Sequence, residues 1–464
     1  MATLSFYGAA GTVTGSRHFL ELGGKKLLID SGLFQGSKSN RLKNWEPFPI
    51  EPGLIDRVLL THAHIDHIGY LPRLFKDGFS GAVHCTHGTR DLAEILLKDS
   101  AHLQQEEAAW ANKRGSSKHK PALPLYSIED AERVLSLFSP VHYGQDLYLD
   151  DHTRVKFKDA GHILGASMID IKVNSGRESK KILFSGDMGR AREIILRDPT
   201  QVFDVDYLVM ESTYGDRLHE ESDTRADLAK VINESIERGG VLLIPAFSVG
   251  RTQTILFLIR ELEEEGLIPS IPIYVDSPMA IDATAIFRKH IPDLNLRTRI
   301  LKLEGKKVFS PQRLKFCKTR DESKAINHVK NRAIVISASG MVTGGRILHH
   351  MINRLPHREN TVLFVGYQAV GTRGRTIVEG NESVKIFGEY FPIRARIESI
   401  SGFSGHADYH EILAFLMAFN KPPEKTFLVH GEPEAAQSLQ EKIRNRFGWD
   451  VHIAQFGESF ELKI

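Results

Sequence analysis

The stretch Thr61-His-Ala-His-Ile-Asp-His-Ile-Gly-Tyr-Leu-Pro72 decides the fold of this chain. The apolar run Val58–Leu60 before it predicts a short strand, and apolar residues at helical spacing from Ile68 to Phe75 predict a helix. The polar residues between them therefore lie on a strand-to-helix turn, where several side chains can converge. A histidine-rich surface turn is the alternative interpretation. Four residues of metal-ligand type on one turn favour a metal site instead.

The order of these polar residues predicts two metal ions rather than one. In an extended segment, His62 and His64 point to the same side. Asp66 and His67 come after the bend and point elsewhere. The pattern therefore predicts two imidazoles for one ion, and a carboxylate with an imidazole for the other. Nitrogen and oxygen ligands of this kind suit Zn²⁺, and Mn²⁺ or Fe²⁺ also accept them.

The composition is that of a soluble globular protein with a large core. The 464 residues are 41% hydrophobic and 25% charged, and this length predicts two or three domains. The formal net charge of +2 does not by itself indicate a nucleic-acid binder, so a polyanion site must come from a local arrangement. Two cysteines and no long apolar segment predict a reducing, cytoplasmic location without a membrane span.

Further residues of ligand type follow predicted strands elsewhere in the chain. Asp30 ends one strand, where it either forms a turn or orients a metal-binding histidine from behind. His162 and Asp187 stand beside glycines, which give the backbone room to carry a side chain into a site. Together with the turn at 61–67, these two supply the missing third and bridging ligands. Two more histidines, His406 and His430, lie in the same setting near the C-terminus.

The character of the sequence changes after Glu211-Ser-Thr-Tyr-Gly215. From about residue 241 to 365, apolar strands alternate with helices, which predicts a parallel sheet covered by helices. Ligands bind such sheets beyond the carboxyl ends of the strands, and the hydroxyls, glycines and arginines found there suit an RNA phosphate backbone. Helix-capping turns are the alternative for each residue. The candidate RNA-binding residues are Ser248, Arg251, Ser339, Arg373 and Arg375.

These segments together resemble the metallo-β-lactamase superfamily and, within it, the β-CASP nucleases. The resemblance spans essentially the whole chain. The histidine in the last motif makes the chain similar to the RNA 3′-processing branch, because the DNA-repair members generally lack it. The residues that carry the resemblance are Asp30, the run His62-x-His64-x-Asp66-His67, His162, Asp187, Glu211, His406 and His430.

The resemblance implies an α/β fold, the metallo-β-lactamase αββα sandwich, with an inserted β-CASP domain built on a parallel sheet. The expected boundaries are 1–214 for the first part of the metallo-β-lactamase domain, 215–394 for the insertion and 395–464 for the C-terminal part. The active site would then lie in the cleft between the two domains.

The same resemblance implies a zinc-dependent ribonuclease that hydrolyses RNA phosphodiester bonds with two Zn²⁺, for which Mn²⁺ is a substitute. The ions would lower the pKa of a water and stabilise the charge that develops on the phosphoryl group. His406 would protonate the leaving 3′-oxygen, and Glu211 would keep it protonated. Asp66 counts among both the catalytic and the metal-binding groups. The implied ligands are His62, His64 and His162 for one ion, Asp66, His67 and His430 for the other, and Asp187 as the bridge.

Several alternatives stay open at this point. A DNA nuclease of the same family, a small-ester or thioester metallo-hydrolase, and an inactive scaffold protein share parts of the pattern. The second domain argues against the ester hydrolase, and the complete set of ligand positions argues against the scaffold. The sequence does not distinguish endonuclease from 5′–3′ exonuclease activity, or RNA processing from RNA decay, and it leaves a homodimer open.

Overall fold

The computed structural model describes residues 2–176, 178–220, 223–369 and 371–464. The chain divides into two compact units. The first unit comprises Met1–Leu218 and Gly405–Ile464, and the second comprises His219–Ser404. The mixed α/β architecture predicted from the sequence is confirmed. Every residue proposed above as a metal ligand or proton donor belongs to the first unit.

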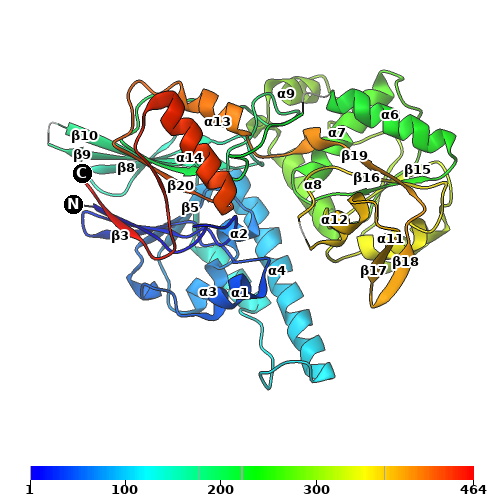
Figure 1. Cartoon of the computed structure of the whole chain (residues 1–464), viewed down its shortest axis with the longest axis horizontal. Coiled ribbons are helices and arrows are strands. Elements are labelled where there is room, and N and C mark those ends of the chain that lie inside the picture. The colour runs from blue at the N-terminus through cyan, green and yellow to red at the C-terminus, as the bar shows by residue number, and fades with distance from the viewer. Residues whose placement is uncertain (1, 177, 221–222, 370) are drawn as a thin grey trace. The chain divides into compact units, whose positions relative to one another are not determined.

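The first unit contains two seven-stranded sheets. Helices flank the first sheet on one side of the unit, and α13 and α14 cover the second sheet on the other (Figure 1). The first sheet has the order β22-β1-β2-β3-β4-β5-β6. Its strands are β1 (Ala2–Phe6), β2 (His18–Leu22), β3 (Lys25–Ile29), β4 (Arg57–Leu59), β5 (Ala82–Thr86), β6 (Phe138–Val141) and β22 (Ser459–Leu462). Its helices are α1 (Lys38–Leu42), α2 (Ile65–Ile68), α3 (Leu71–Lys76), α4 (His87–Arg114) and α5 (Ile128–Val134).

The second sheet has the order β21-β20-β11-β10-β9-β8-β7. Alternating burial along β8 shows one face turned inward, as expected for period-two side chains. Phe6 and Leu20 of the first sheet pack with Ile169, Phe184 and Phe427 of the second to form the core between the sheets. The strands are β7 (Asp146–Tyr148), β8 (Thr153–Asp159), β9 (Ser167–Ser175), β10 (Glu178–Phe184), β11 (Tyr207–Glu211), β20 (Lys425–Val429) and β21 (Val451–Ile453), and the helices are α13 (Tyr409–Leu416) and α14 (Pro433–Phe447).

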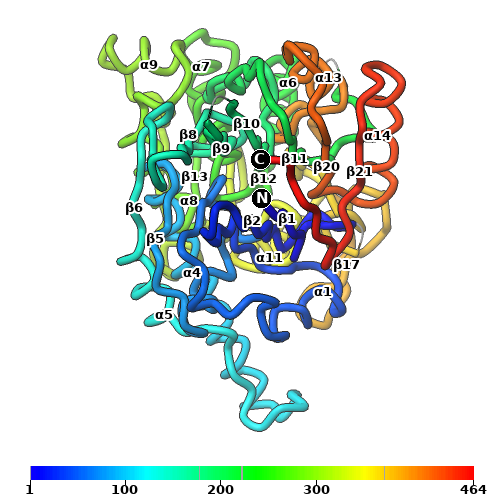
Figure 2. Tube along the Cα trace, turned by 90° about the vertical axis from the view of Figure 1, so that its left-hand side faces the viewer, coloured from blue at the N-terminus to red at the C-terminus, as the bar shows by residue number. Residues whose placement is uncertain are grey.

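The C-terminal segment completes both sheets. β22 pairs antiparallel with β1, so the two ends of the chain lie side by side (Figure 2). β20 pairs in parallel with β11, and β21 pairs in parallel with β20. A residue at the end of β20 therefore lies beside residues from the middle of the chain, although more than 200 positions separate them.

The candidate ligands lie at matching ends of these strands. β3 is parallel to β4, and β10, β11 and β20 are mutually parallel. β8 runs in the same direction as β10, because both are antiparallel to β9. The carboxyl ends of parallel strands meet at one edge of a sheet. Side chains that follow β4, β8, β10 and β20 are therefore brought together there.

The long helix α4 departs in one respect from its expected packing. The sequence predicts a helix from about Thr89 to Lys113 with one apolar face, made of Leu92, Ile95, Leu96 and Leu103. Leu92 and Leu96 are buried, but Leu103 is 51% exposed. The C-terminal half of α4 extends beyond the body of the unit, so this residue has little to pack against (Figure 1).

The second unit contains a fully parallel six-stranded sheet of order β14-β13-β15-β12-β16-β19. β12 and β15 are buried along their whole length, which is typical of strands covered on both faces. Its strands are β12 (Val241–Pro245), β13 (Ile273–Val275), β14 (Leu314–Phe316), β15 (Ala333–Ser337), β16 (Thr361–Phe364) and β19 (Arg396–Ser399), with a separate hairpin of β17 (Ser383–Ile386) and β18 (Glu389–Pro392). Its helices are α6 (Thr224–Glu237), α7 (Arg251–Glu264), α8 (Pro278–Lys289), α9 (Leu296–Leu303), α10 (Arg320–Ala325), α11 (Ile347–Arg354) and α12 (Arg373–Val378).

Across the described residues, the helices are too short or too polar to cross a lipid bilayer.

Candidate metal centre

Three histidines and one aspartate form the first cluster. His64 Nδ1 lies 3.1 Å from His62 Nε2 and 3.2 Å from His162 Nε2. Asp187 Oδ2 lies 3.5 Å from the first of these Nε2 atoms and 3.6 Å from the second. Ligand nitrogens of a tetrahedral zinc ion are about 3.3 Å apart, given Zn–N bonds of about 2.0–2.1 Å. The four groups can hold one ion together.

Two histidines and one aspartate form the second cluster. His67 Nε2 and His430 Nε2 are 3.1 Å apart, and Asp66 Oδ2 lies 3.4 Å from His430 Nε2. Asp66 and His67 belong to the short helix α2, whereas His430 follows β20. These groups also lie close enough together to hold one ion.

Asp187 faces both clusters. Its Oδ2 points to the first cluster, and its Oδ1 lies 3.3 Å from His67 Nε2 in the second. The carboxylate is 2% exposed, and Oδ1 has no hydrogen-bond partner among the described residues. A buried carboxylate oxygen without a donor is costly unless a cation neutralises it. The position of Asp187 therefore fits the bridging role proposed for it.

Hydrogen bonds at the outer nitrogens fix two of the histidine rings. His162 Nδ1 lies 2.9 Å from the carbonyl oxygen of Gly405, which can only accept, so Nδ1 carries the proton. The Thr213 hydroxyl donates to the carbonyl oxygen of His430 and thus accepts from His430 Nδ1 at 3.2 Å. In both neutral rings Nε2 then carries no proton, and its lone pair faces the cluster to which the ring belongs.

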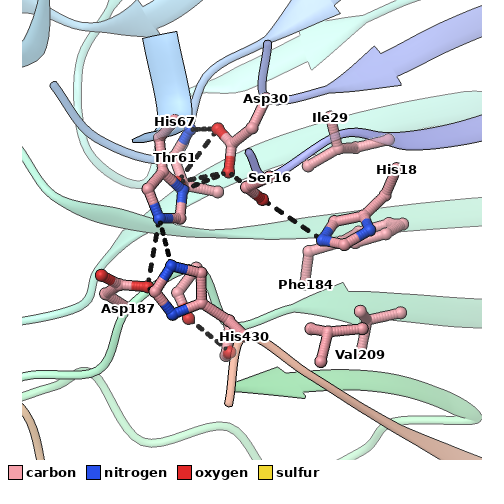
Figure 3. Close-up of a pocket in the computed structure, with 13 residues that line it drawn as sticks. Ser16, His18, Ile29, Asp30, Thr61, His67, Phe184, Asp187, Val209 and His430 are labelled. Carbon is pink, nitrogen blue, oxygen red and sulfur yellow. Dashed lines mark hydrogen bonds and ion pairs between the residues drawn. The ribbon is translucent and has the colours of Figure 1, made fainter. Parts of the chain in front are cut away.

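Asp30 fixes the rings of His67 and His62 in the same way, and Figure 3 shows its contacts with His67 and Thr61. His67 Nδ1 donates to Asp30 Oδ2 at 2.7 Å. The Thr61 hydroxyl also donates to this carboxylate, at 2.9 Å, and therefore accepts from His62 Nδ1 at 3.1 Å. The Thr61 backbone N–H and the Ser16 hydroxyl add further hydrogen bonds to Asp30. One buried carboxylate thus orients a histidine in each cluster.

These proton assignments test whether the residues fit a metal ion. In the neutral rings, the Nε2 lone pairs of His67 and His430 face each other at 3.1 Å. Two lone pairs at this distance repel unless a cation, either a proton or a metal ion, lies between them. The Nε2 lone pairs of His62 and His162 face His64 Nδ1 at 3.1 and 3.2 Å. The nitrogen and oxygen donors are those that zinc prefers, and the described residues contribute no thiolate, since Cys85 and Cys317 are buried elsewhere. The geometry therefore fits a metal ion in each cluster.

The electrostatics differ between the two clusters. Burial, followed by the charge of a neighbouring histidine, lowers the pKa of His62 and of His162 well below its usual value. Burial also lowers the pKa of His67, but Asp187 and Asp30 outweigh it and raise that pKa well above its usual value. The histidines of the first cluster are therefore neutral and ready for a metal, whereas a metal in the second cluster displaces the proton of His67.

The carboxylates of the centre are ionised. Burial raises the pKa of Asp66, but the neighbouring His430 and His67 outweigh it and lower the pKa to about 2. Burial likewise raises the pKa of Asp187, and the charges of His430, His67 and His62 bring it well below its usual value. Two negative charges therefore face the positions where the cations would bind.

His406 and Glu211 lie at the edge of the centre. His406 Nδ1 is 3.3 Å from Glu211, and the ring is 22% exposed, whereas the carboxylate is fully buried. The Met188 N–H donates to Glu211 Oε1 and fixes the carboxylate. Burial lowers the pKa of His406, but Glu211 and then Asp187 outweigh it and raise the pKa to about 9. The ring of His406 is thus partly accessible and protonated, and it lies beside the two clusters of candidate ligands.

Unusual backbone conformations support two of these positions. Asp30 has φ 61° and His430 has φ 48°, a left-handed region that non-glycine residues adopt at a cost of order 1 kcal/mol or more. Gly32 lies so close to the metal-binding turn that a Cβ would stand 1.6 Å from the carbonyl oxygen of Asp66. The chain accepts strain and close approach where the candidate ligands are placed.

The candidate RNA-binding residues all lie in the second unit. Their side chains contact other residues of that unit. The Ser248 hydroxyl is 3.2 Å from that of Ser277, and the Ser339 hydroxyl accepts from Thr343 N–H. Arg251 lies at the start of α7 and reaches over the ring of Phe403 at 5.7 Å. Arg373 donates to the carbonyl oxygens of Val342, Thr343 and Lys385, and Arg375 pairs with Glu379. The two last arginines thus have structural partners within the unit.

Two residues of the centre have no role in the sequence-based expectation. Thr61 opens the decisive stretch and Thr213 follows Glu211, and each hydroxyl fixes the ring of a histidine. A hydroxyl residue next to a predicted ligand is the only signal in the sequence. That signal is weak, because each hydroxyl has two possible partners. Only the folded structure shows which partner accepts the hydroxyl proton and which one donates to the hydroxyl oxygen.

Comparison with protein families finds three matching models. The metallo-beta-lactamase superfamily model matches residues 15–234, and the Beta-Casp domain model matches residues 252–377. A Zn-dependent metallo-hydrolase RNA specificity domain matches residues 390–454.

Relatives and solved structures are similar over nearly the whole chain. Ribonuclease TTHA0252 of Thermus thermophilus is 36% identical over 97% of this chain and 98% of its own length. Transcription termination factor FttA of Methanocaldococcus jannaschii is 28% identical over 99% of this chain and 72% of its own length. A crystal structure of a protein of unknown function from Enterococcus faecalis shares the fold, with a TM-score of 0.55, 12% identity and 99% and 100% of the two chains covered.

Proposed function

The chain belongs to the β-CASP family of the metallo-β-lactamase superfamily, and on that premise we propose that it is a metal-dependent ribonuclease. The observation that carries the proposal is the pair of clusters that share the buried carboxylate of Asp187, whose Oδ1 has no hydrogen-bond partner among the described residues. Two adjacent cations suit the in-line hydrolysis of a phosphodiester. The RNA specificity model and the similarity to a ribonuclease favour RNA as the substrate.

The proposal assigns two Zn²⁺ to the centre, with Mn²⁺ as a substitute. His62, His64 and His162 would hold one ion, and Asp187 would be shared with the other. Asp66, His67 and His430 would complete the second site. When bound, the ions supply a water of lowered pKa and stabilise negative charge on phosphoryl oxygens. The first unit would be the metallo-β-lactamase domain and the second the β-CASP domain.

The residues around the clusters would divide the remaining work. Asp30, Thr61 and Thr213 hold the histidine rings so that Nε2 faces inward. His406 would donate its proton to the leaving 3′-oxygen of the RNA, a group that departs poorly as an alkoxide. Glu211 would stabilise the protonated ring before the donation. Asp66 and Asp187 would balance part of the positive charge of the centre.

The proposal extends to the surroundings of the enzyme. The two free, buried cysteines suit a reducing compartment, and we propose the cytoplasm as its location. A homodimer is part of the proposal, and gel filtration with light scattering tests it independently of activity.

A single assay tests the proposed function. The purified protein with zinc is incubated with RNA and with DNA of the same single-stranded sequence, labelled at either end and with or without a 5′ phosphate. Cleavage of RNA, lost with a chelator and restored by zinc, is expected. The fragment pattern at the two labels separates endonuclease from 5′–3′ exonuclease activity. Turnover of a thioester or lactone without RNA cleavage, or cleavage of DNA alone, would refute the ribonuclease.

The pH dependence of cleavage reports on the pair of His406 and Glu211. The raised pKa of His406 means that the donor form is present below this pKa and is lost as the pH rises through it. Glu211→Gln removes the negative charge, so the alkaline limb of the kcat profile is expected to move to lower pH, by about one unit or more. Bound cations lower the pKa in both proteins, so the difference between them is the measurement. An unchanged alkaline limb would separate Glu211 from the donor.

A further inference from the structure

A chain of hydrogen bonds runs from His67 of the second cluster through Asp30 and Ser16 to the buried His18, and we call this chain the arm. His18, on β2, is 4% exposed and stands with Ser16 on the far side of Asp30 from His67 (Figure 3). Its Nε2 lies 3.3 Å from the Ser16 hydroxyl. That hydroxyl lies 3.3 Å from Asp30 Oδ2, which in turn accepts from His67 Nδ1. The expected ligand set leaves this histidine without a role.

The direction of the protons along the arm follows from its chemistry. Asp30 is an acceptor, so the Ser16 hydroxyl gives it its only hydrogen. The hydroxyl oxygen must then accept from His18, which places the ring proton on Nε2. His18 Nδ1 is buried and has no hydrogen-bond partner among the described residues, as the bare nitrogen of this tautomer requires. Burial lowers the pKa of the ring to about 3, so the ring is neutral.

Packing alone does not hold the ring of His18 in this orientation. The ring stacks on Phe184 with centroids 6.3 Å apart and meets the edge of Phe6 at 5.6 Å. Ser16, His18 and Asp30 also line a cavity of about 10 Å³, roughly the space of one water molecule. The ring therefore has room on one side, and its hydrogen bond to Ser16 sets its orientation.

We propose that His18, acting through Ser16 and Asp30, is a positioning residue for the metal ion held by Asp66, His67 and His430. Each donor in the arm points its proton toward Asp30, so the donors polarise one another in the same direction. The arm holds the Asp30 carboxylate where His67 Nδ1 must donate to it and Nε2 must face the metal. The inference rests on the ligand set of the proposed function, and its test reads metal binding rather than cleavage.

Two variants of His18 separate the hydrogen bond from the ring. His18→Phe keeps an aromatic ring and removes the donor, whereas His18→Gln carries an amide N–H near the position of Nε2. Zinc affinity is measured by chelator competition. The zinc-binding constant that is lost in His430→Ala is assigned to the second site. His18→Phe is expected to weaken the second site about tenfold, the lower end of the range for groups behind metal ligands. The first site should weaken less, because Asp30 reaches His62 only through the Thr61 hydroxyl. His18→Gln is expected to restore most of the loss.

A double-mutant cycle and a matched control complete the experiment. Ser16→Ala should cost at least as much as His18→Phe, because it also removes the hydrogen bond to Asp30. The two together should cost no more than Ser16→Ala alone, because both break one arm. His84 is equally buried on β5 of the same sheet, away from the arm, so His84→Phe should leave both zinc constants unchanged.

The outcomes distinguish this inference from the proposed function. An unaffected second site in His18→Phe, equal losses in His18→Phe and His18→Gln, or an equal loss in His84→Phe would overturn the positioning role alone. A parent protein that binds only one zinc ion would overturn the ligand set, and the positioning role with it.

Discussion

His406→Ala is expected to retain both metal ions and to lose cleavage of RNA by about 10²- to 10⁴-fold, the usual contribution of a positioned proton donor. The ring lies next to His162, with centroids 4.5 Å apart, but its Nδ1 is committed to Glu211. Its loss therefore leaves both sets of ligands intact. The leaving 3′-oxygen would then depart without a proton from the protein.

The measurement pairs single-turnover cleavage with elemental analysis of zinc. His410→Ala is the matched control, because His410 is an exposed histidine on the same segment and meets the ring of Tyr409 edge-on. The control should cleave RNA at the parental rate. An RNA bearing a good leaving group at the scissile bond should restore much of the rate of His406→Ala, since such a group needs no proton. Undiminished cleavage of ordinary RNA by His406→Ala would remove His406 from the mechanism.

The sequence predicts the candidate centre well where ligands cluster on one turn. His62, His64, Asp66 and His67 occupy one strand-to-helix turn, so their convergence follows from local geometry. His430 is different, because its place beside His67 depends on the parallel pairing of β20 with β11. Nothing in its local pattern indicates that pairing. The resemblance to a family supplied what periodicity could not.

The supporting hydrogen bonds are harder to predict than the ligands. Thr61, Thr213 and Ser16 are small hydroxyl residues of a kind common in turns. Their roles depend on which atom accepts the single hydroxyl proton, and that is decided by Asp30 or by a backbone carbonyl brought from elsewhere in the fold. The left-handed backbone of Asp30 is equally invisible in the sequence.

The α/β fold is predicted more completely than the packing of individual elements. Apolar strands such as β12 and β15 indicate a sheet covered on both faces, and the sheet of the second unit is parallel as expected. Leu103 shows the limit of periodicity. It occupies an apolar position of α4, but burial also requires a partner element, and that half of the helix has little beside it.

Asp187→Ala is expected to remove metal as well as activity, unlike loss of the proton donor, because it removes a ligand of both ions at once. Asp187 is the only residue of the described centre whose two carboxylate oxygens face different clusters. Its removal leaves His62 in the first cluster and His67 in the second with less negative charge to offset two cations. Zinc content should fall below two ions per chain. Cleavage should fall by about 10³-fold or more, since several kcal/mol of charge stabilisation is lost.

Zinc content, measured by elemental analysis after dialysis, decides between this role and a purely structural one. Asp170→Ala provides the matched control, because Asp170 is a buried carboxylate of the same sheet that pairs with Lys158 at 2.9 Å rather than with a histidine. The control should keep two ions and full activity even if it unfolds at a lower temperature. Asp187→Ala with two tightly held zinc ions would contradict the bridge. A shared ligand requires that the variant stays folded but loses metal and activity together. Its melting temperature should then be no lower than that of the metal-free parent.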